Sequence, residues 1–189
     1  MKIGGTQRAS DMLIQPYNPN WAINFEKIKE ILDASVFNYI LDIQHVGSTA
    51  VPNLAAKPII DIDIIYGEDD DFDNVKTALE KLGYYYNGNQ GIEGREVFKR
   101  SGKQTDEILD KIIHHLYVCK ADCVELQRHI LFRDYLRKDE FTRKFYGKLK
   151  YKIAEETQNN KSDYAILKQL KVNPFIDYVI ELEKNANNE

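Results

Sequence analysis

The sequence predicts an α+β fold, in which a mixed β-sheet with flanking helices is followed by a helical C-terminal part. Short runs of branched aliphatic residues, typical of strands, lie before residue 120. Other segments in this part have apolar residues that recur at helical spacing. From residue 121 onward the pattern is helical throughout. This order of elements favours one sheet domain with a helical extension.

The first helix is expected over residues 17–35, with Asn20 near its cap. Four residues at helical spacing form its apolar face: Trp21, Phe25, Ile28 and Leu32. A second helix is expected over residues 72–82, after an acidic turn at residues 68–73, and Gly83 ends it. Both helices are expected to flank the sheet.

Strands are expected in two pairs. Residues 41–46 and 58–66 form the first pair, and glycine and proline punctuate the loop between them. Residues 96–100 and 112–119 form the second pair. A Gly- and Asn-rich loop precedes this second pair, and a polar turn at residues 101–110 joins its two strands.

Three helices are expected after the strands, over residues 122–138, 139–158 and 162–185. Pro174 lies inside the last of them and is expected to kink or restart it, because proline lacks the N–H that an α-helix needs.

Length and composition fit one globular unit. Hydrophobic residues make up 43% of the 189 residues and charged residues 30%, which is enough to build a core. The expected parts are a flexible N-terminal extension (residues 1–13), an α/β core (14–120) and a helical region packed on that core (121–189).

Bulk properties exclude several classes of protein. The net charge of −4 argues against a protein that coats nucleic acid. The sequence starts without the apolar run of a signal peptide, and no stretch approaches the ~18 apolar residues of a membrane span. A cytoplasmic protein without a membrane partner is therefore expected. Cys119 and Cys123 are too few for a disulfide framework, and their spacing is not that of a usual structural zinc site.

Charge is unevenly distributed along the chain. Residues 58–75 contain seven acids and no Lys or Arg, whereas residues 120–152 contain ten Lys or Arg and five acids. Such a chain is suited to hold cations near its acidic part and phosphates near its basic part.

Two aspartates, Asp61 and Asp63, lie among the isoleucines of the second strand. Because side chains alternate along a strand, both carboxylates point to the same face, with Cα atoms about 6.5–7 Å apart. Carboxylates at this separation can share one divalent cation or bracket a pair of cations about 3.5–4 Å apart. Since Mg²⁺ prefers carboxylate and phosphate oxygens, the strand predicts a site for Mg²⁺ or Mn²⁺ bound with a phosphate-bearing substrate.

The turn before this strand contains a second candidate site. Gly47 and Ser48 follow the first strand, where backbone N–H groups and a hydroxyl can face a phosphate. Ser48 could instead cap a helix that starts at Thr49. Lys57, immediately before Pro58, either reaches a phosphate or lies on the surface.

The order of strand, Gly-Ser, about a dozen residues and Asp-x-Asp resembles the signature of the polymerase-beta-type nucleotidyltransferase superfamily. Five segments together resemble the motifs of the GrpB-like family, a bacterial group within that fold: "HVGSTAVPNLAAKPIIDI", "GIEGREVFKR", "HHLYVC", "HILFRDYLR" and "YGKLKYKIA". The resemblance covers about residues 14–170. It implies a nucleotidyltransferase-like fold, in which Gly47 and Ser48 grip the terminal phosphates of a nucleotide and Asp61 and Asp63 hold the metal. Some members are joined to a dephospho-coenzyme A kinase domain, so the resemblance also points to nucleotide or coenzyme metabolism. The expected partner is a nucleoside triphosphate or a coenzyme-like small molecule.

The chain departs from that pattern in its carboxylates. The family fixes the first aspartate, whereas its second acidic position, here Asp63, is often not acidic. Active nucleotidyltransferases place a third carboxylate on a neighbouring strand, but the expected strand offers His115 and Tyr117 on that face. Glu96, in the partner strand, is the candidate substitute. The resemblance therefore leaves open whether the site is active.

Further candidate site residues each have two readings. Arg95 either clamps a phosphate with two hydrogen bonds or forms a salt bridge to the acidic turn. Arg133 and Arg137, one helical turn apart beside His129, form either a basic groove for a phosphate-bearing substrate or a solvated face. His45 precedes the Gly-Ser turn and either lines the pocket or packs in the core.

The leading hypothesis is a metal-dependent nucleotidyltransferase, in which a hydroxyl attacks the α-phosphate of a nucleoside triphosphate and pyrophosphate leaves. The residues assigned are Asp61 and Asp63 for metal and catalysis, and Gly47, Ser48, Lys57, Arg95 and Arg133 for the phosphates. The alternative is a catalytically retired fold that binds a nucleotide, a coenzyme or a protein. Nucleic-acid binding through the basic helices is not expected at a net charge of −4. The sequence leaves the acceptor, the base preference and the oligomeric state open.

Overall fold

The structure of the chain is a computed structural model, which describes residues 12–102 and 106–186. The strands are β1 (Asp42–Val46), β2 (Ile60–Tyr66), β3 (Tyr84–Tyr86), β4 (Arg95–Arg100) and β5 (His114–Lys120). The α-helices are α1 (Asn20–Val36), α2 (Asp69–Lys81), α3 (Glu107–Lys111), α4 (Val124–Lys138), α5 (Glu140–Glu156) and α6 (Lys161–Ala186). Two 3₁₀-helices, η2 (Phe37–Tyr39) and η3 (Ser48–Ala50), flank β1.

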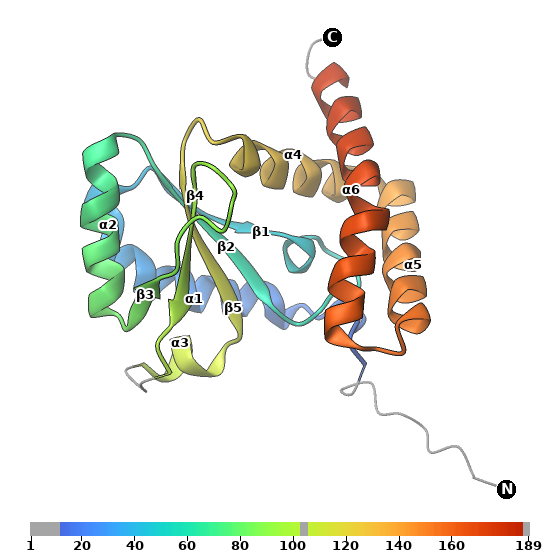
Figure 1. Cartoon of the computed structure of the whole chain (residues 1–189), viewed down its shortest axis with the longest axis horizontal. Helices are drawn as coiled ribbons and strands as arrows, with labels where there is room; N and C mark the ends of the chain where they lie inside the picture. Colours follow the sequence, from blue (N-terminus) through green and yellow to red (C-terminus); the bar gives the residue numbers. More distant parts are fainter. Residues whose placement is uncertain (1–11, 103–105, 187–189) are drawn as a thin grey trace, which may run out of the picture.

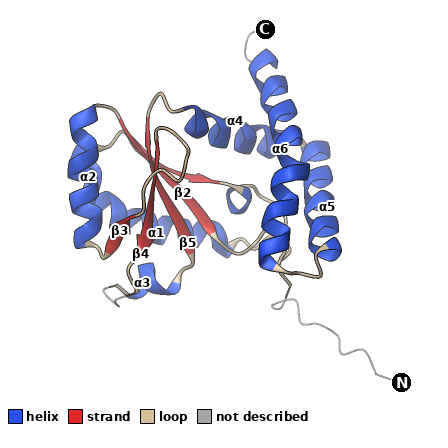
Figure 2. Ribbon diagram, in the orientation of Figure 1, coloured by secondary structure: helices blue, strands red, loops and turns tan. Residues whose placement is uncertain are grey.

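The described strands form one mixed sheet in the order β1-β2-β5-β4-β3. The pair β2–β5 is parallel and the other pairs are antiparallel. Figure 1 shows α1 crossing behind the strands, α2 at one end of the sheet and α4, α5 and α6 gathered at the other. Figure 2 shows the same arrangement by type of element, with a helical C-terminal part beside the strands. The expected α+β fold is confirmed.

One face of the sheet packs on α1 and α2 and forms the main core. Ile60, Ile62 and Ile64 point to this face, where they meet the apolar side of α1. The predicted face of that helix is buried in full: Trp21, Phe25, Ile28 and Leu32. The buried residues of β2 recur every second position and those of α1 about every 3.6 positions. The core residues of both elements are therefore those that the sequence periodicity predicts.

The opposite face of the sheet carries the polar side chains. Because paired residues share a face, the strand register puts His115 beside Asp61 and Tyr117 beside Asp63. The C-terminal helices approach this side, and α5 and α6 build a second core with the loop that follows η3. The expected alternation in β5, with His115 and Tyr117 facing the aspartates, is confirmed.

Three local features differ from the sequence analysis or are missing from it. The residues expected to form an acidic turn begin α2, and Oδ2 of Asp71 accepts a hydrogen bond from the backbone N–H of Glu68 at 3.3 Å. Carboxylates are favourable there because the helix dipole is positive at its N-terminus. The Tyr-rich segment β3 pairs with β4 and was not expected as a strand. Within the expected polar turn, Asp106 caps α3 by accepting bonds from Ile108 and Leu109, each 2.8 Å long.

Both ends of the chain differ in detail from the expectations. Residues 1–11 lie outside the described part, so the expected flexible extension is described only at its end, where Leu13 is buried. Gln15 forms a bridge with Ala56. At the other end, α6 continues through Pro174 without restarting. None of the described helices is long and apolar enough to cross a membrane.

Candidate functional site

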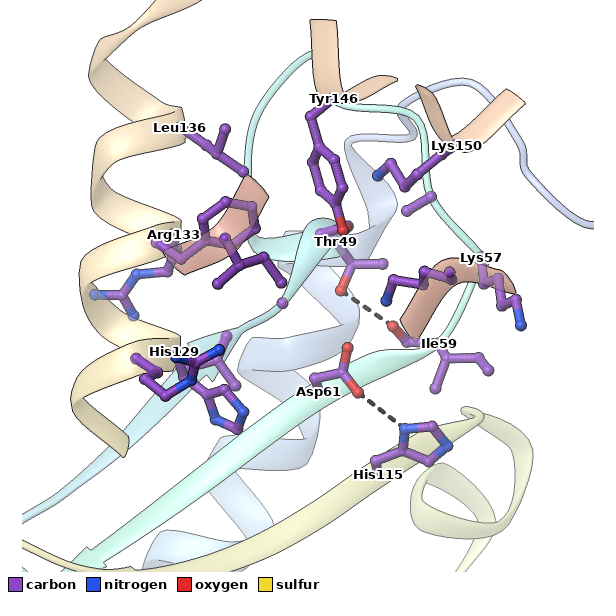
Figure 3. A pocket seen from close by; sticks show the side chains of 18 of the residues that line it. Thr49, Lys57, Ile59, Asp61, His115, His129, Arg133, Leu136, Tyr146 and Lys150 are labelled. Carbon is purple, nitrogen blue, oxygen red and sulfur yellow. Dashed lines mark hydrogen bonds and ion pairs between the residues drawn. The ribbon is translucent and has the colours of Figure 1, made fainter. Parts of the chain in front are cut away.

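A cavity of about 490 Å³ lies between the polar face of the sheet, the loop that follows β1 and the helices α4, α5 and α6. Figure 3 shows Asp61 and His115 on its sheet side, His129 and Arg133 on α4, and Tyr146 and Lys150 on α5. The structure thus brings together residues from the start, the middle and the end of the chain. Seven of the residues predicted for the site line it: Gly47, Ser48, Lys57, Asp61, His115, Tyr117 and Arg133.

Gly47 lies directly against the Asp61 carboxylate. Its φ of +70° is in the left-handed region, which glycine adopts without a steric cost. A Cβ atom at this position would collide with Oδ2 of Asp61 and lie 3.0 Å from its Cγ. The backbone of the Gly-Ser turn is therefore close to the carboxylate only because residue 47 has no side chain.

Asp61 is held on its other side by His115. Its Oδ1 accepts a hydrogen bond from Nδ1 of His115 at 2.9 Å, across the parallel pair of β2 and β5. The carboxyl group is partly open, with 29% of the Asp61 side chain exposed. In the described part of the chain, Oδ2 of Asp61 has no hydrogen-bond partner. One carboxylate oxygen thus remains available at the cavity wall.

Asp63 lies deeper and is fully buried, at 0% exposure. Its Oδ2 accepts a hydrogen bond from Nδ1 of His129 at 2.8 Å, and Nε2 of His129 lies 3.4 Å from Oε1 of Glu125. Burial acts to lower the pKa of His129, but hydrogen bonds to the two carboxylates outweigh it and raise that pKa to about 10. Burial also raises the pKa of Asp63, and the bond from His129 opposes this rise.

Three lysines surround the other end of the cavity: Lys57, Lys150 and Lys168. Burial lowers the pKa of Lys57, and the positive charge of Lys168 lowers it further. Burial likewise holds the pKa of Lys150 well below its usual range, again with a contribution from Lys168. Interaction with Tyr146 raises the pKa of Lys168, although burial opposes the rise, and the Asp61 carboxylate adds to it. These ammonium groups repel one another, so an anion among them would be stabilised.

The lysines differ in how free they are. Nζ of Lys150 donates to the carbonyl oxygen of Ala55 and lies 4.4 Å from the ring centre of Tyr146. Nζ of Lys57 lies 4.3 Å above the ring of Tyr164. Among the described residues, neither Lys57 nor Lys168 has a carboxylate within salt-bridge distance. These two side chains are the better donors for a bound ligand.

Two predicted residues face away from the cavity. His45 pairs with Ile62 and therefore points to the α1 face, where it stacks on Phe25 with ring centres 4.7 Å apart. Burial lowers its pKa to about 4. Glu96 also faces the α1 and α2 side, because it pairs with Val118, and it accepts a hydrogen bond from the Tyr86 hydroxyl at 2.6 Å. The structure therefore does not bring Glu96 to the site as a third carboxylate.

The two predicted phosphate-binding arginines differ: Arg133 is bound by several protein groups, whereas Nε of Arg95 is buried without a hydrogen-bond partner in the described chain. Nη1 of Arg133 donates to Oε1 of Gln44 at 2.6 Å and to the carbonyl oxygen of His45 at 2.9 Å, and Nε donates to Asp134. These bonds tie α4 to β1, so Arg133 lines the cavity mainly as a structural residue. The guanidinium of Arg95 lies on the polar face of the sheet, 4.8 Å from the ring of Tyr117, outside the cavity lining.

The carboxylates of Asp61 and Asp63 could bind a divalent cation that needs few protein ligands. Each of the two aspartates has one carboxylate oxygen without a hydrogen-bond partner among the described residues, Oδ2 of Asp61 and the buried Oδ1 of Asp63, and both aspartates lie on one face of one strand. No group of three or more His, Cys, Asp or Glu among the described residues is arranged to hold a metal. Mg²⁺ commonly takes one or two carboxylates and completes its shell with phosphate oxygens and water. The two aspartates match that use.

Comparisons with known proteins identify the family of the chain. The family described as "GrpB protein" matches residues 11–183. The chain belongs to the GrpB family. The "Glutamate-rich protein GrpB" of Alkalihalophilus pseudofirmus is 33% identical over 172 residues, which are 90% of this chain and 94% of that protein. The protein YqkA of Bacillus subtilis is 34% identical over 148 residues, 78% of this chain. Only 41% of YqkA is covered, so this GrpB chain spans about two-fifths of that relative.

Solved structures extend the comparison to the fold. The crystal structure of conserved protein GrpB from Enterococcus faecalis has a TM-score of 0.76 and 30% identity, and covers 93% of this chain and 99% of that one. Cid1, in a structure with its short product ApU, has a TM-score of 0.53 at 10% identity, over 75% of this chain and 43% of that one. The GrpB chain therefore shares a fold with a nucleotidyltransferase, and the likeness at this identity concerns the fold alone.

Several residues of the site were not predicted: Glu125, Lys150 and Lys168. Glu125 and His129 are four residues apart on an expected helix, which places both on one face and is a usable signal. Lys150 belongs to the segment "YGKLKYKIA", which resembles a family motif. No local pattern distinguishes Lys168 from the other lysines of the C-terminal helices. Cys119 and Cys123, whose spacing does not suit a structural zinc site, are both buried free thiols.

Proposed function

We propose that this GrpB protein binds a nucleoside triphosphate in the cavity and transfers its nucleotidyl group to a hydroxyl acceptor. One observation carries the proposal. The Asp61 carboxylate and the Gly47–Ser48 turn share one wall of a cavity whose other end holds lysines without carboxylate partners. Such a cavity offers an anionic group for a cation and cationic groups for phosphates.

In this proposal the phosphate tail extends from the Gly-Ser turn towards the lysines. Ser48 is half-buried at the start of η3, where its hydroxyl faces no partner in the described chain. Lys57 and Lys168 neutralise charge on the outer phosphates, which helps pyrophosphate to leave. The arrangement acts through positioning and charge stabilisation, so it needs few specialised side chains.

Asp61 and Asp63 would hold a Mg²⁺ or Mn²⁺ ion bound together with the nucleotide. When bound, such a cation supplies charge neutralisation and polarises phosphoryl oxygens. The remaining contribution of the chain is orientation. His115 fixes the rotamer of Asp61, and His129 fixes that of Asp63.

A transfer assay tests the proposal. Purified protein is incubated with each ribonucleoside triphosphate, labelled at the α-phosphate, with Mg²⁺ or Mn²⁺ and a panel of hydroxyl acceptors. Pyrophosphate release that depends on the acceptor, together with label on the acceptor, is the expected result. Neither product with any triphosphate would reject transfer.

A second candidate function is binding without transfer. This candidate is favoured because His129 forms ion pairs with both Asp63 and Glu125, which leaves fewer carboxylate oxygens for a metal. In that case a nucleotide or a coenzyme-like molecule binds the cavity without release of pyrophosphate. Measured binding with no turnover would select this candidate over the first.

A further inference from the structure

Two tyrosines of the C-terminal helices line the cavity with buried side chains and unpaired hydroxyl groups. Tyr146 lies on α5 and Tyr164 on α6, and they are exposed to only 2% and 1%. Neither hydroxyl has a hydrogen-bond partner in the part of the chain that the structure describes. Because a buried polar group without a partner costs free energy, two such groups in one cavity point to a ligand that bonds to them.

Both hydroxyl oxygens are open to the cavity. In the described chain, the side-chain atoms that are sealed from solvent without a hydrogen-bond partner are Oδ1 of Asp63, Nε of Arg95 and Oε2 of Glu183. The tyrosine hydroxyls are not among these atoms, so a small molecule in the cavity can reach them. Figure 3 shows Tyr146 extending from α5 towards Thr49. The Thr49 hydroxyl donates to the carbonyl oxygen of Ile59 at 3.1 Å, which leaves the Tyr146 hydroxyl for a ligand.

Cationic groups surround these hydroxyls. Nζ of Lys57 lies 4.3 Å from the ring centre of Tyr164, and Nζ of Lys150 lies 4.4 Å from that of Tyr146. Interaction with Tyr146 raises the pKa of Lys168, although burial opposes the rise. Burial raises the pKa of Tyr164, so its hydroxyl keeps the proton that it can donate. Since ammonium groups only donate hydrogen bonds, this end of the cavity suits a group with several acceptor oxygens, such as a phosphate.

In the proposed function, the phosphate tail of the nucleotide extends towards this end of the cavity. The inner phosphates would lie near Asp61 and the Gly-Ser turn, so the terminal phosphate is the group that reaches the tyrosines. We infer that the hydroxyls of Tyr146 and Tyr164 bind this terminal phosphate, so that the cavity selects triphosphates over monophosphates. The inference rests on the proposed nucleotide site and adds the residues that recognise the length of the phosphate chain.

Removal of each hydroxyl tests the inference. The native chain, Tyr146→Phe and Tyr164→Phe are titrated by calorimetry in the presence of Mg²⁺. The probes are a non-hydrolysable nucleoside triphosphate analogue, the corresponding monophosphate and inorganic tripolyphosphate. Because a hydrogen bond to a charged group is lost, each variant should bind the triphosphate analogue and tripolyphosphate about tenfold more weakly. Affinity for the monophosphate should not change, because this ligand does not reach the hydroxyls.

Two further variants are controls. Tyr178→Phe removes a hydroxyl from an exposed part of α6 outside the cavity lining and should leave all affinities unchanged. Tyr84→Phe removes a hydroxyl that lies 2.6 Å from Nε2 of His114, so it should lower the melting temperature by leaving this nitrogen without its partner. Tyr146→Phe and Tyr164→Phe should not lower the melting temperature, since their hydroxyls have no partner to lose in the described chain.

The outcomes separate the inference from the proposed function. Unchanged affinity for the triphosphate analogue in both tyrosine variants would overturn the inference and leave the nucleotide site standing. An equal loss of affinity for the triphosphate and the monophosphate would do the same. Native binding of tripolyphosphate but not of the nucleotide analogue, with the expected loss in the variants, would support phosphate binding by the tyrosines and count against the nucleotide site. If the native chain binds none of the probes, both are overturned.

Discussion

Nδ1 of His115 lies 2.9 Å from Oδ1 of Asp61, directly across the parallel pair of β2 and β5. The residue that faces Asp61 on the neighbouring strand is thus a histidine. A third carboxylate would be expected on a neighbouring strand in an active nucleotidyltransferase. Only Oδ2 of Asp61 is left for a ligand, next to the Gly47 backbone. At the cavity wall, Asp61 therefore offers a ligand one partly exposed carboxylate oxygen.

Asp61→Asn is expected to abolish the metal-dependent part of triphosphate binding. The amide is nearly isosteric, but it removes the negative charge that a hard cation requires. Isothermal titration calorimetry with a non-hydrolysable triphosphate analogue, with and without Mg²⁺, measures this part directly. Asp33→Asn, an identical change on an exposed part of α1, is the control and should leave both affinities unchanged. Equal metal dependence in both variants would contradict the assignment of Asp61.

Gly47→Ala is expected to weaken binding of the triphosphate analogue, and the loss of folding stability alone should not account for this weakening. At φ +70° and ψ −169° the substitution adds a backbone cost of about 1–3 kcal/mol, and it also pushes the Asp61 carboxylate aside. Gly88→Ala is the matched control, because Gly88 has the same φ of +70° and open space where a Cβ would lie. In chemical denaturation both variants should lose stability, and Gly47→Ala should lose more because of the collision with Asp61. Only Gly47→Ala should lose affinity for the triphosphate analogue, and an equal loss in both would reject the close approach as its cause.

Lys57→Gln and Lys168→Gln are each expected to weaken triphosphate binding about ten- to a hundredfold. A hydrogen bond to a charged group contributes about 1.5–3 kcal/mol, which corresponds to that range of affinity. The exposed Lys148→Gln, on α5 outside the cavity lining, is the control for the loss of one charge. Affinity for a nucleoside monophosphate should change less than affinity for the triphosphate. If all three variants bind alike, the phosphate tail does not reach the lysines.

His45 is expected to make the fold sensitive to acid. Its pKa is about 4 in the folded protein against an ordinary value of 6.5, so the unfolded chain binds more protons between these values. Its contribution to stability is therefore fully present above pH 6.5 and is lost as the pH falls towards 4. A shift of this size corresponds to about 3 kcal/mol, at roughly 1.4 kcal/mol for each pKa unit.

The His45→Gln variant isolates this contribution. The amide keeps a partner for the Thr49 hydroxyl, which lies 3.0 Å from Nε2 of His45, and cannot be protonated in this range. Melting temperatures measured from pH 7 to pH 4 should fall less steeply in the variant than in the native chain. Parallel curves would show that His45 does not cause the acid sensitivity.

Much of the sheet and its polar face could be predicted from local pattern. Alternation in β2 places Asp61 and Asp63 on one side and the isoleucines in the core, and the structure has this arrangement. The same rule could have placed His45, which is two residues after the core residue Ile43 and shares its face. Alternation along β1 was therefore enough to place His45 in the core. His45 was considered as a pocket residue because it lies just before the Gly-Ser turn.

The rest of the site depends on tertiary packing. Glu125, Lys150 and Lys168 reach the cavity because α4, α5 and α6 pack beside the sheet, and the crossing of helices is not encoded in the spacing of any one of them. In the same packing, Nη1 of Arg133 donates hydrogen bonds to residues of β1, although the position of Arg133 in the sequence suggested that it binds a phosphate. Side chains that bridge distant elements are therefore the part that sequence reasoning could not resolve.

Thermal stabilisation by metal and nucleotide together is the most direct test of the central claim, which is that a triphosphate and a divalent cation share the cavity. The melting temperature of the native chain is measured with each ribonucleoside triphosphate, with Mg²⁺ or Mn²⁺, and with both. A ligand that binds only the folded state raises this temperature by mass action. The melting temperature is expected to rise with at least one triphosphate, and this rise should require the cation as well. No rise with any combination, or the same rise without a cation, would contradict it.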